Sequence, residues 1–229
     1  MTSTFLSCGF GPGISTACAR RFGRAGLGLA LVGRSADKVS AGASALAAEG
    51  LSARAFPGDL GDTAAVARIV AEARSALGPI KVIHWNAYGM LAGDLVTAPE
   101  AELRQMLDVG VHGVLAAVRA ALPDLKSQKG AVLITGGGLA LEDAKTDAVA
   151  VEWRVMGLAL VKAAQRKLAS LLNRRLASEG VYVGEVSVRG IVKGTSFDRG
   201  QATLDPAQIA DRFWDLYEKR EPVTVAFPG

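Results

Sequence analysis

The stretch that decides the fold is Cys8-Gly9-Phe10-Gly11-Pro12-Gly13-Ile14-Ser15, which joins an apolar run to a helical period near the amino terminus. Its glycines let the backbone turn sharply and come close to a pyrophosphate, whose charge the amino end of the following helix stabilises. An ordinary tight connection is the alternative. In an alternating α/β chain, however, such a loop is typical of dinucleotide binding. The contacts that we expect are Gly9, Phe10, Gly11, Gly13 and Ile14.

Around this loop, short apolar runs alternate with longer helical periods. The strand-like runs are residues 3–8, 27–32, 51–56, 80–85, 131–135, 181–188 and, more weakly, 223–227. The helical stretches are residues 14–25, 36–49, 63–77, 99–126, 152–178 and 206–219. Near-continuous apolar strands separated by helices imply a parallel sheet that is covered on both faces. We therefore predict an α/β fold, a doubly wound (Rossmann) parallel sheet of about seven strands with helices on both faces, formed by a single domain over residues 1–229.

Composition narrows the class of protein further. Half of the residues are hydrophobic and 21% are charged, which is too apolar for a disordered chain. We expect no membrane helix, because no apolar stretch reaches the roughly 18 residues that one needs, and no secretory leader, because residues 1–20 lack a basic segment followed by an apolar one and a cleavage site. Cys8 and Cys18 give neither a disulfide framework nor a metal cluster. The net charge of +4 comes from dispersed Arg and Lys. We expect a cytoplasmic protein with a small-molecule substrate, no bound metal, and neither nucleic acid nor membrane as partner.

The end of the second strand predicts which cofactor binds. In this fold that position, about 20 residues beyond the glycines, meets the adenosine ribose, and an acidic side chain there accepts from the 2′-hydroxyl of NAD. The sequence instead has Gly33-Arg34-Ser35. The guanidinium of Arg34 suits a 2′-phosphate, with Ser35 as a second donor. This favours NADP(H) over NAD; a solvent-facing arginine is the alternative.

Taken together, these segments resemble the short-chain dehydrogenase/reductase family over essentially the whole chain. The segments that carry the resemblance are residues 9–15, Gly33-Arg34-Ser35, Gly58-Asp59-Leu60, Asn86-Ala87-Tyr88-Gly89, residues 107–123, Lys162 and Glu179-Gly180-Val181-Tyr182-Val183. The resemblance implies that Asp59 and Leu60 hold the adenine and that Asn86 and Ala87 line the nicotinamide side. It also implies that Gly190 and Ile191 approach the carboxamide.

The same resemblance exposes a departure at the catalytic residues. The family uses a tyrosine four residues before a lysine, together with a serine and an asparagine. Lys162 is present and would bind the nicotinamide ribose, a surface lysine being the alternative, but Leu158 occupies the tyrosine position. The serine position falls in Thr135-Gly136-Gly137-Gly138, and the asparagine position is Gly110. A positioned general acid is worth roughly 10²–10⁴-fold, so its absence disfavours the standard mechanism.

Two hypotheses follow from this departure. The first is an NADP(H)-dependent oxidoreductase with an atypical active site, in which Lys162 acts with water or Tyr88 as proton donor on a carbonyl, an imine or an activated alkene. In that case Tyr88 is catalytic; its alternative is a packing or lid aromatic. The second is a catalytically impaired NADP(H)-binding sensor or scaffold. We further expect a short, mobile substrate lid near residues 191–205. By resemblance, we also expect a homodimer or homotetramer through the fourth and fifth helices, residues 100–126 and 153–178.

Overall fold

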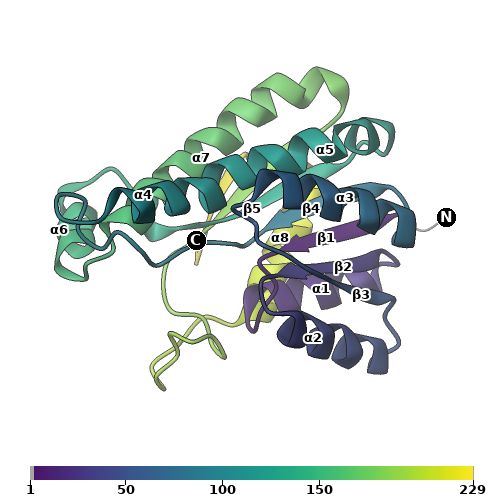
Figure 1. Ribbon diagram of the computed structural model, residues 1–229, viewed down its shortest axis with the longest axis horizontal. Helices are drawn as coiled ribbons and strands as arrows, with labels where there is room; N and C mark the ends of the chain where they lie inside the picture. Colours follow the sequence, from purple (N-terminus) through teal and green to yellow (C-terminus); the bar gives the residue numbers. More distant parts are fainter. Residues whose placement is uncertain (1–2, 229) are drawn as a thin grey trace.

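The fold is a parallel sheet between two layers of helices (Figure 1). The computed structural model describes residues 3–228. The strands are β1 (Thr4–Cys8), β2 (Gly28–Gly33), β3 (Ala53–Pro57), β4 (Ile80–Trp85), β5 (Ala131–Gly137), β6 (Tyr182–Val188) and β7 (Thr224–Phe227). They form one seven-stranded sheet in the order β3-β2-β1-β4-β5-β6-β7, with every neighbouring pair parallel. The predicted doubly wound α/β fold is confirmed.

Helices cover both faces of the sheet. One layer contains α3 (Thr63–Leu77), α5 (Gly113–Ser127) and α7 (Met156–Leu176), and the other contains α1 (Ile14–Arg24), α2 (Ala36–Ala48) and α8 (Pro206–Lys219) (Figure 1). Shorter elements are α4 (Glu100–Leu107), the π-helical turn η1 (Asp108–His112), the 3₁₀ turns η2 (Gly138–Ala140) and η3 (Ala177–Glu179), and α6 (Ala144–Glu152). Each crossover brings the chain back to a parallel strand, and such connections are right-handed as a rule.

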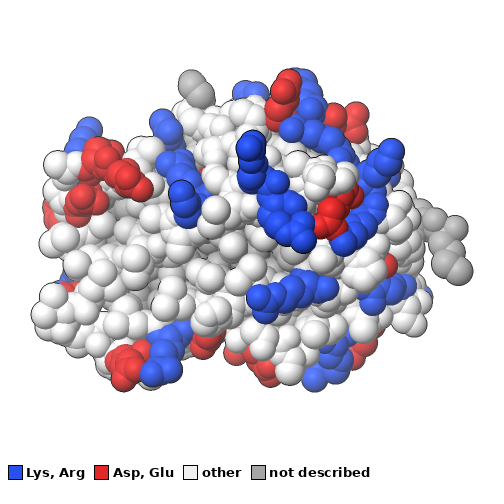
Figure 2. Space-filling model, turned by 90° about the horizontal axis from the view of Figure 1, so that it is seen from above, with Lys and Arg blue, Asp and Glu red and all other residues white. Residues whose placement is uncertain are grey.

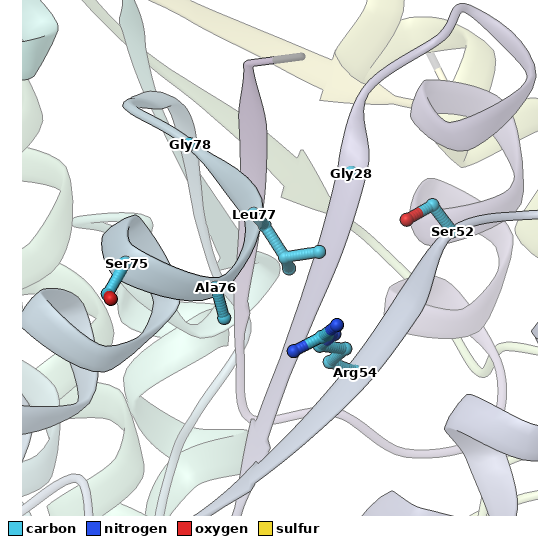
Figure 3. Close-up of a pocket in the computed structure, with 7 residues that line it drawn as sticks. All are labelled: Gly28, Ser52, Arg54, Ser75, Ala76, Leu77 and Gly78. Carbon is cyan, nitrogen blue, oxygen red and sulfur yellow. The ribbon is translucent and has the colours of Figure 1, made fainter. Parts of the chain in front are cut away.

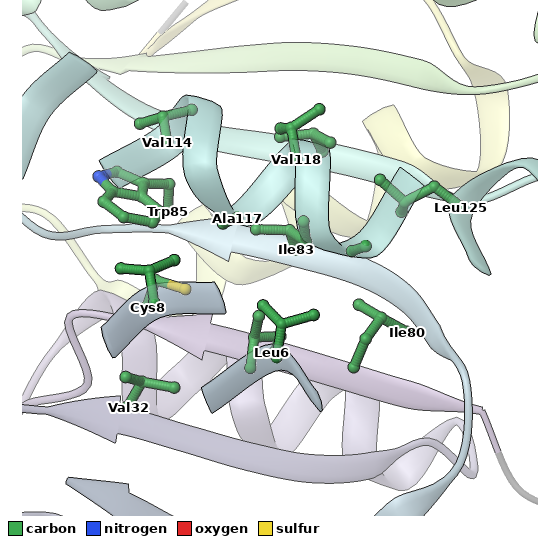
Figure 4. Packing of buried hydrophobic residues seen from close by; sticks show 14 of the residues in the cluster. Leu6, Cys8, Val32, Ile80, Ile83, Trp85, Val114, Ala117, Val118 and Leu125 are labelled. Atoms are coloured by element: carbon green, nitrogen blue, oxygen red, sulfur yellow. The ribbon is translucent and has the colours of Figure 1, made fainter. Parts of the chain in front are cut away.

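The core between the sheet and the α3–α5–α7 layer is built from alternate residues of neighbouring strands. Leu6 of β1, Ile83 of β4 and Val132 of β5 point to this layer, where they meet apolar side chains of α3 and α5. Figure 4 shows Leu6 and Ile83 with apolar side chains of α5. Ile83 and Leu6 are fully buried. Because the side chains of a strand alternate between the two faces, the intervening residues of these strands pack against the other helical layer.

The strand order places the candidate site. From β1 the chain continues to β2 and β3 on one side, whereas β4 and the later strands lie on the other side. The loops that leave β1 and β4 therefore diverge, and ligands of open α/β sheets bind in the crevice beyond such carboxyl ends. The glycine loop follows β1, and Asn86 follows β4, so both lie at this edge of the sheet.

Positively charged side chains gather toward the opposite edge of the sheet. Seen on the face that α3, α5 and α7 cover, most Lys and Arg lie over the half of the molecule where these helices end (Figure 2). Their last turns carry Arg74, Lys126, Arg174 and Arg175. Cations at helix carboxyl ends complement the helix dipole, so this basic surface has a structural explanation.

The predicted helix over residues 152–178 is wrong at its beginning. The structure has two helices, α6 and α7, separated by Trp153, Arg154 and Val155. Arg154 has a positive φ of 53°, which ends α6. The first amides of α7 donate to the loop after β4, with Met156 N bonded to Gly93 O and Gly157 N to Ala92 O. This long-range docking sets the start of α7, and local helix propensity does not reveal it.

The run Glu100–Ser127 also corrects an expectation. It is one continuous helical path through α4, η1 and α5, and by length and hydropathy it could cross a membrane, although the sequence was expected to contain no such stretch. Val114, Ala117 and Val118 of this run are buried against the sheet. A core helix of this kind passes the same test of length and composition as a membrane helix, so this property is weak evidence for a membrane span.

Truncation of Ile83 to alanine tests the core. We expect Ile83→Ala to lower the free energy of unfolding by about 2–5 kcal/mol, because it leaves a cavity between β4 and α5. The control is Val96→Ala, since Val96 is 89% exposed and its truncation should change stability by less than about 0.5 kcal/mol. Urea denaturation of both variants makes the comparison. Equal effects would contradict the packing described for this layer.

Candidate active site

The glycine loop fits closely between two other segments. Gly9 and Gly13 both have a φ of 84°, a conformation that favours glycine. A Cβ at Gly9 would lie 2.5 Å from the backbone nitrogen of Ala87, and a Cβ at Gly13 would lie 2.6 Å from Cγ2 of Thr195. Backbone conformation therefore favours glycine at both positions, and the nearby backbone of Ala87 also leaves no space for a side chain at Gly9. The loop touches the segment after β4 on one side and the segment after β6 on the other.

The amino end of α1 is open to an anion. Gly13 is its N-cap and provides no side-chain cap, and the first turn has no acidic residue. Ser15 instead braces the loop, since its hydroxyl donates to Gly11 O at 2.9 Å and accepts from Gly11 N at 2.8 Å. A Cβ at Gly11 would have nothing within 4 Å, so space remains above the loop. This cradle fits the pyrophosphate of a dinucleotide.

Arg34 and Ser35 lie exposed after β2, as a 2′-phosphate site would require. Among residues 3–228, Arg34 has no ion pair or side-chain hydrogen bond. Ser35 is the N-cap of α2 and accepts from Lys38 N at 3.4 Å, which leaves its hydroxyl proton free to donate. The side chain of Phe10 points away from the loop and packs on α2. Its ring lies so close to this helix that a Cβ at Gly42 would be 2.2 Å from it. Phe10 thus supports the loop from behind through its side chain.

The residues predicted around adenine and nicotinamide lie along the same edge. Leu60 is buried, and Asp59 uses Oδ1 to accept from Gly61 N at 2.9 Å. Asn86 donates from Nδ2 to Gly9 O at 3.3 Å and so ties the β4 loop to the glycine loop. Ala87 contacts Gly9 as described, and its side chain is buried.

Lys162 is buried on α7 rather than lying on the surface. It is 7% exposed, and its Nζ donates to Thr135 O at 2.7 Å and to Gln165 Oε1 at 3.0 Å. Burial lowers the pKa of Lys162 to about 8, although the carboxylate of Glu185 acts in the opposite direction. An ammonium group with such a pKa titrates close to physiological pH and can exchange a proton there.

Tyr88 lies over this lysine. The Nζ of Lys162 is 5.7 Å from the centroid of the Tyr88 ring, and Tyr88 stacks on Phe197 with ring centroids 6.3 Å apart. Tyr88 and Phe197 are 39% and 44% exposed. Partial burial raises the pKa of the Tyr88 phenol. A phenol that is less acidic than usual is a poorer proton donor than the neighbouring ammonium.

Two of the positions that resemblance assigns to other catalytic side chains, 158 and 110, are filled differently here. Leu158, one turn before Lys162, packs in an apolar cluster with Ala92 and Met106. A Cβ at Gly110 would lie 2.1 Å from Cγ1 of Val161, so no side chain fits there.

The serine position falls within Thr135-Gly136-Gly137-Gly138, at the end of β5 and the start of η2. A Cβ at Gly136 would lie 1.8 Å from Oε1 of Glu185, which is fully buried on β6. That carboxylate accepts through Oε2 from Arg166 at 3.3 Å and from Thr224 at 3.2 Å. A buried carboxylate thus leaves no room for a side chain at 136. A Cβ at Gly137, by contrast, would meet no atom closer than 3.9 Å, and its nearest neighbours include Cγ and Cδ of Lys162.

The segment after β6 covers the glycine loop. Gly190 has a φ of 153°, and Ile191 is exposed at the start of the predicted lid. Val192 and Leu204 are buried and form a β-bridge that closes the segment at its two ends. Between them, Asp198 accepts from the backbone amides of Gly194, Gly200 and Ala202.

Sequence reasoning missed several residues of this site. They are Thr195 above Gly13, Phe197 on Tyr88, Gln165 beside Lys162, and the pair Arg166 and Glu185. A charged glutamate inside the apolar strand 181–188 was a visible signal, because buried carboxylates need partners. Thr195 and Phe197 lie in a loop without periodicity, where no pattern locates a contact.

A pocket at the other edge of the sheet is separate from this site. It is lined by Gly28, Ser52, Arg54, Ser75, Ala76, Leu77 and Gly78, which lie at the amino ends of β2, β3 and β4 (Figure 3). Arg54 is the one ionisable side chain of this lining. It lacks the acid, base or nucleophile pair that would indicate catalysis.

Comparisons with known proteins agree with the fold and show the family. A family model described as short chain dehydrogenase matches residues 4–202. An uncharacterized oxidoreductase of Staphylococcus aureus is 27% identical over 218 residues, covering 93% of this chain and 89% of that protein. A mutant Serratia marcescens short-chain dehydrogenase/reductase has a TM-score of 0.83 at 22% identity, covering 98% of this chain and 95% of that chain.

A second solved structure is a short-chain dehydrogenase from Sphingobium yanoikuyae in complex with NADPH. Its TM-score is 0.80 at 22% identity, covering 99% of this chain and 88% of that chain. The sheet order, the glycine loop and the lysine of α7 define a dinucleotide-binding α/β protein. With the family match, the chain belongs to the short-chain dehydrogenase family, and it is an oxidoreductase of that type.

The contact between Gly110 and Val161 can be tested by a double-mutant cycle. Gly110→Ala should destabilise the protein by about 1–3 kcal/mol, because its methyl group would overlap Val161. Adding Val161→Ala makes room, so the double variant should be more stable than the sum of the single effects by about 0.5–3 kcal/mol. Denaturant unfolding of the unaltered protein, the two single variants and the double variant gives the four stabilities that the cycle needs. Additive effects would show that the two positions do not contact each other.

Proposed function

We propose that the protein is an NADP(H)-dependent oxidoreductase of the short-chain dehydrogenase type with an atypical active site. Its reaction would transfer hydride between NADPH and a small carbonyl, imine or activated alkene. The observation that carries this proposal is the buried ammonium of Lys162 beside Tyr88, with Leu158 in place of a phenol one turn earlier. The substrate acceptor would be protonated by a group other than the family tyrosine.

Two observations support NADP(H) as the cofactor. Arg34 and Ser35 offer free donors at the end of β2, where the 2′-phosphate would lie. The structural neighbour from Sphingobium yanoikuyae binds NADPH. In the proposed complex, Gly9, Gly11, Gly13 and the amino end of α1 hold the pyrophosphate.

The nicotinamide, when bound, supplies the hydride, and the protein's own side chains handle the proton. Lys162 keeps one N–H after its bonds to Thr135 and Gln165, and this N–H is available to the ribose or to the substrate. Tyr88 would cover the reacting face and, with Phe197, exclude water. We assign the acid role to Lys162 rather than to Tyr88, because burial makes the ammonium more acidic and the phenol less acidic.

A sensor or scaffold that binds NADP(H) without turnover is the second candidate. It is favoured by Leu158 in place of the family tyrosine and by Val161, which occupies the space of a side chain at the asparagine position, Gly110. Both candidates need the same cofactor cradle. They differ in whether any acceptor is reduced and in whether Lys162 affects that rate.

The remaining assignments are proposals of the same kind. We propose a single dinucleotide-binding domain over residues 1–229, a substrate lid near residues 191–205 and a cytoplasmic location. We also propose a homodimer or homotetramer through residues 100–126 and 153–178. Exposed apolar side chains on these helices, Leu107, Leu160 and Leu171, support such an interface, because packing of this kind buries them.

Cofactor preference tests the role of Arg34. Arg34→Ala should weaken NADPH binding about 10–100-fold through loss of a charge-assisted contact, and should leave NADH binding nearly unchanged. Titration of both nucleotides by calorimetry or fluorescence measures this. Arg54→Ala is the matched control, an exposed arginine at the opposite edge of the sheet. Tighter binding of NADH than of NADPH by the unaltered protein would overturn the proposed preference.

The pH dependence of turnover tests Lys162 as the acid. Reduction needs the protonated ammonium, so the rate should be constant well below the pKa of about 8 and should fall above it. Lys162→Met should lower kcat roughly 10²–10⁴-fold, whereas Tyr88→Phe, which keeps the ring, should lower it less than about tenfold. Steady-state rates on a panel of carbonyl and imine acceptors make the measurement. The reverse ranking of the two variants would assign the proton to Tyr88.

A further inference from the structure

An unbroken chain of hydrogen bonds links Lys162 to another helix through Gln165. The Nζ of Lys162 donates to Thr135 O at 2.7 Å and to Gln165 Oε1 at 3.0 Å. The amide of Gln165 in turn donates from Nε2 to Gly110 O at 3.1 Å. Three elements, β5, α7 and η1, are thereby joined around one ammonium group.

Both ends of the Gln165 side chain are used, and it is fully buried. Gly110 is also buried and lies in the π-helical turn η1, a distortion that often occurs at functional sites. Since a Cβ at Gly110 would overlap Val161, this turn lies directly against α7. An apolar side chain of the same size at position 165 could fill the volume. It could not accept from Lys162 and donate to Gly110 at the same time.

We propose that Gln165 is a positioning residue, which fixes Lys162 against Thr135 and ties it to the widened turn at Gly110. This inference rests on the proposed function, because it concerns the group to which we assign the proton. Gln165 reaches the chemistry only through Lys162. The Oε1 atom stabilises the charged ammonium, and the bond to Gly110 holds that oxygen in place.

The other charged groups around Lys162 are few. Glu185 approaches from β6 and is paired with Arg166 of α7. Tyr88 approaches from the loop after β4. On η1, Asp108 and His112 pair with each other at 2.8 Å on the exposed side of the turn. Gln165 is thus a neutral hydrogen-bond acceptor of Lys162. It can be replaced by a charged or an apolar side chain while the Glu185–Arg166 and Asp108–His112 pairs remain in place.

Two variants with side chains of similar size should shift the pKa of Lys162 in opposite directions. Gln165→Met removes the acceptor in a buried site and should lower the pKa of Lys162 by about one unit. Gln165→Glu places a carboxylate beside the ammonium and should raise that pKa by about one unit. In turnover, the fall in rate at alkaline pH should shift accordingly. The Met variant should also lose about 10–100-fold in kcat, with KM changed much less.

Asn173→Met is the matched control. Asn173 also lies on α7, and its Oδ1 accepts from Val183 N at 3.1 Å, so the change also removes a hydrogen bond between α7 and a neighbouring element. We expect Asn173→Met and Gln165→Met to lower the melting temperature, and only the latter to change the pH profile. A purely structural role of Gln165 would make the two variants alike in both measurements.

A readout that does not need turnover separates this proposal from the proposed function. The Nζ and Cε resonances of labelled Lys162, followed by NMR across pH, report its pKa in the protein without substrate. Opposite shifts in the Met and Glu variants support the positioning role even if no acceptor is reduced. Unchanged Lys162 titration in both variants overturns the role of Gln165, whatever the activity of the protein.

Discussion

The site depends on the contact between the loop after β1 and the loop after β4. Gly9 approaches the backbone of Ala87 so closely that no side chain fits between them, and Asn86 donates to the carbonyl of the same glycine. This contact joins the loops that follow β1 and β4, the neighbouring strands at which the strand order reverses. It therefore holds both walls of the crevice at a fixed separation, with the amino end of α1 open between them. Without it, the cradle for the pyrophosphate and the position of Tyr88 would be uncoupled.

Burial of Lys162 is the second constraint. A buried ammonium is costly unless hydrogen-bond acceptors surround it, and here a carbonyl and an amide oxygen supply them. The nearby carboxylate of Glu185 favours the charged form, and desolvation opposes it, with desolvation the larger effect. The result is a lysine that gives up its proton more readily than usual. This property suits the proposed acid.

The sequence predicted the sheet well because its signals are local. Apolar runs bounded by glycines mark the strands, and the loop 9–15 marks the edge where ligands bind. The parts that it did not predict depend on contacts between distant residues. Trp153 to Val155 break the helix because residues 92 and 93 accept from the start of α7. Likewise, the neighbours of Gly110 and Gly136 come from α7 and β6, and no spacing along the chain identifies them.

Gly110 changes how the departure from the family pattern is understood. Simple loss of a catalytic side chain leaves a cavity, which is costly in a close-packed interior. At Gly110, Val161 takes that space. The serine position within residues 135–138 differs, because Glu185 leaves no room at Gly136 whereas a Cβ at Gly137 would meet no atom closer than 3.9 Å. Gln165 brings a polar group to Lys162 and bonds the same turn that contains Gly110. Restoring an asparagine at 110 alone would drive its side chain into Val161. A return to the family arrangement at this turn therefore needs a paired change at Val161, which argues for an altered site rather than one that has only lost a side chain.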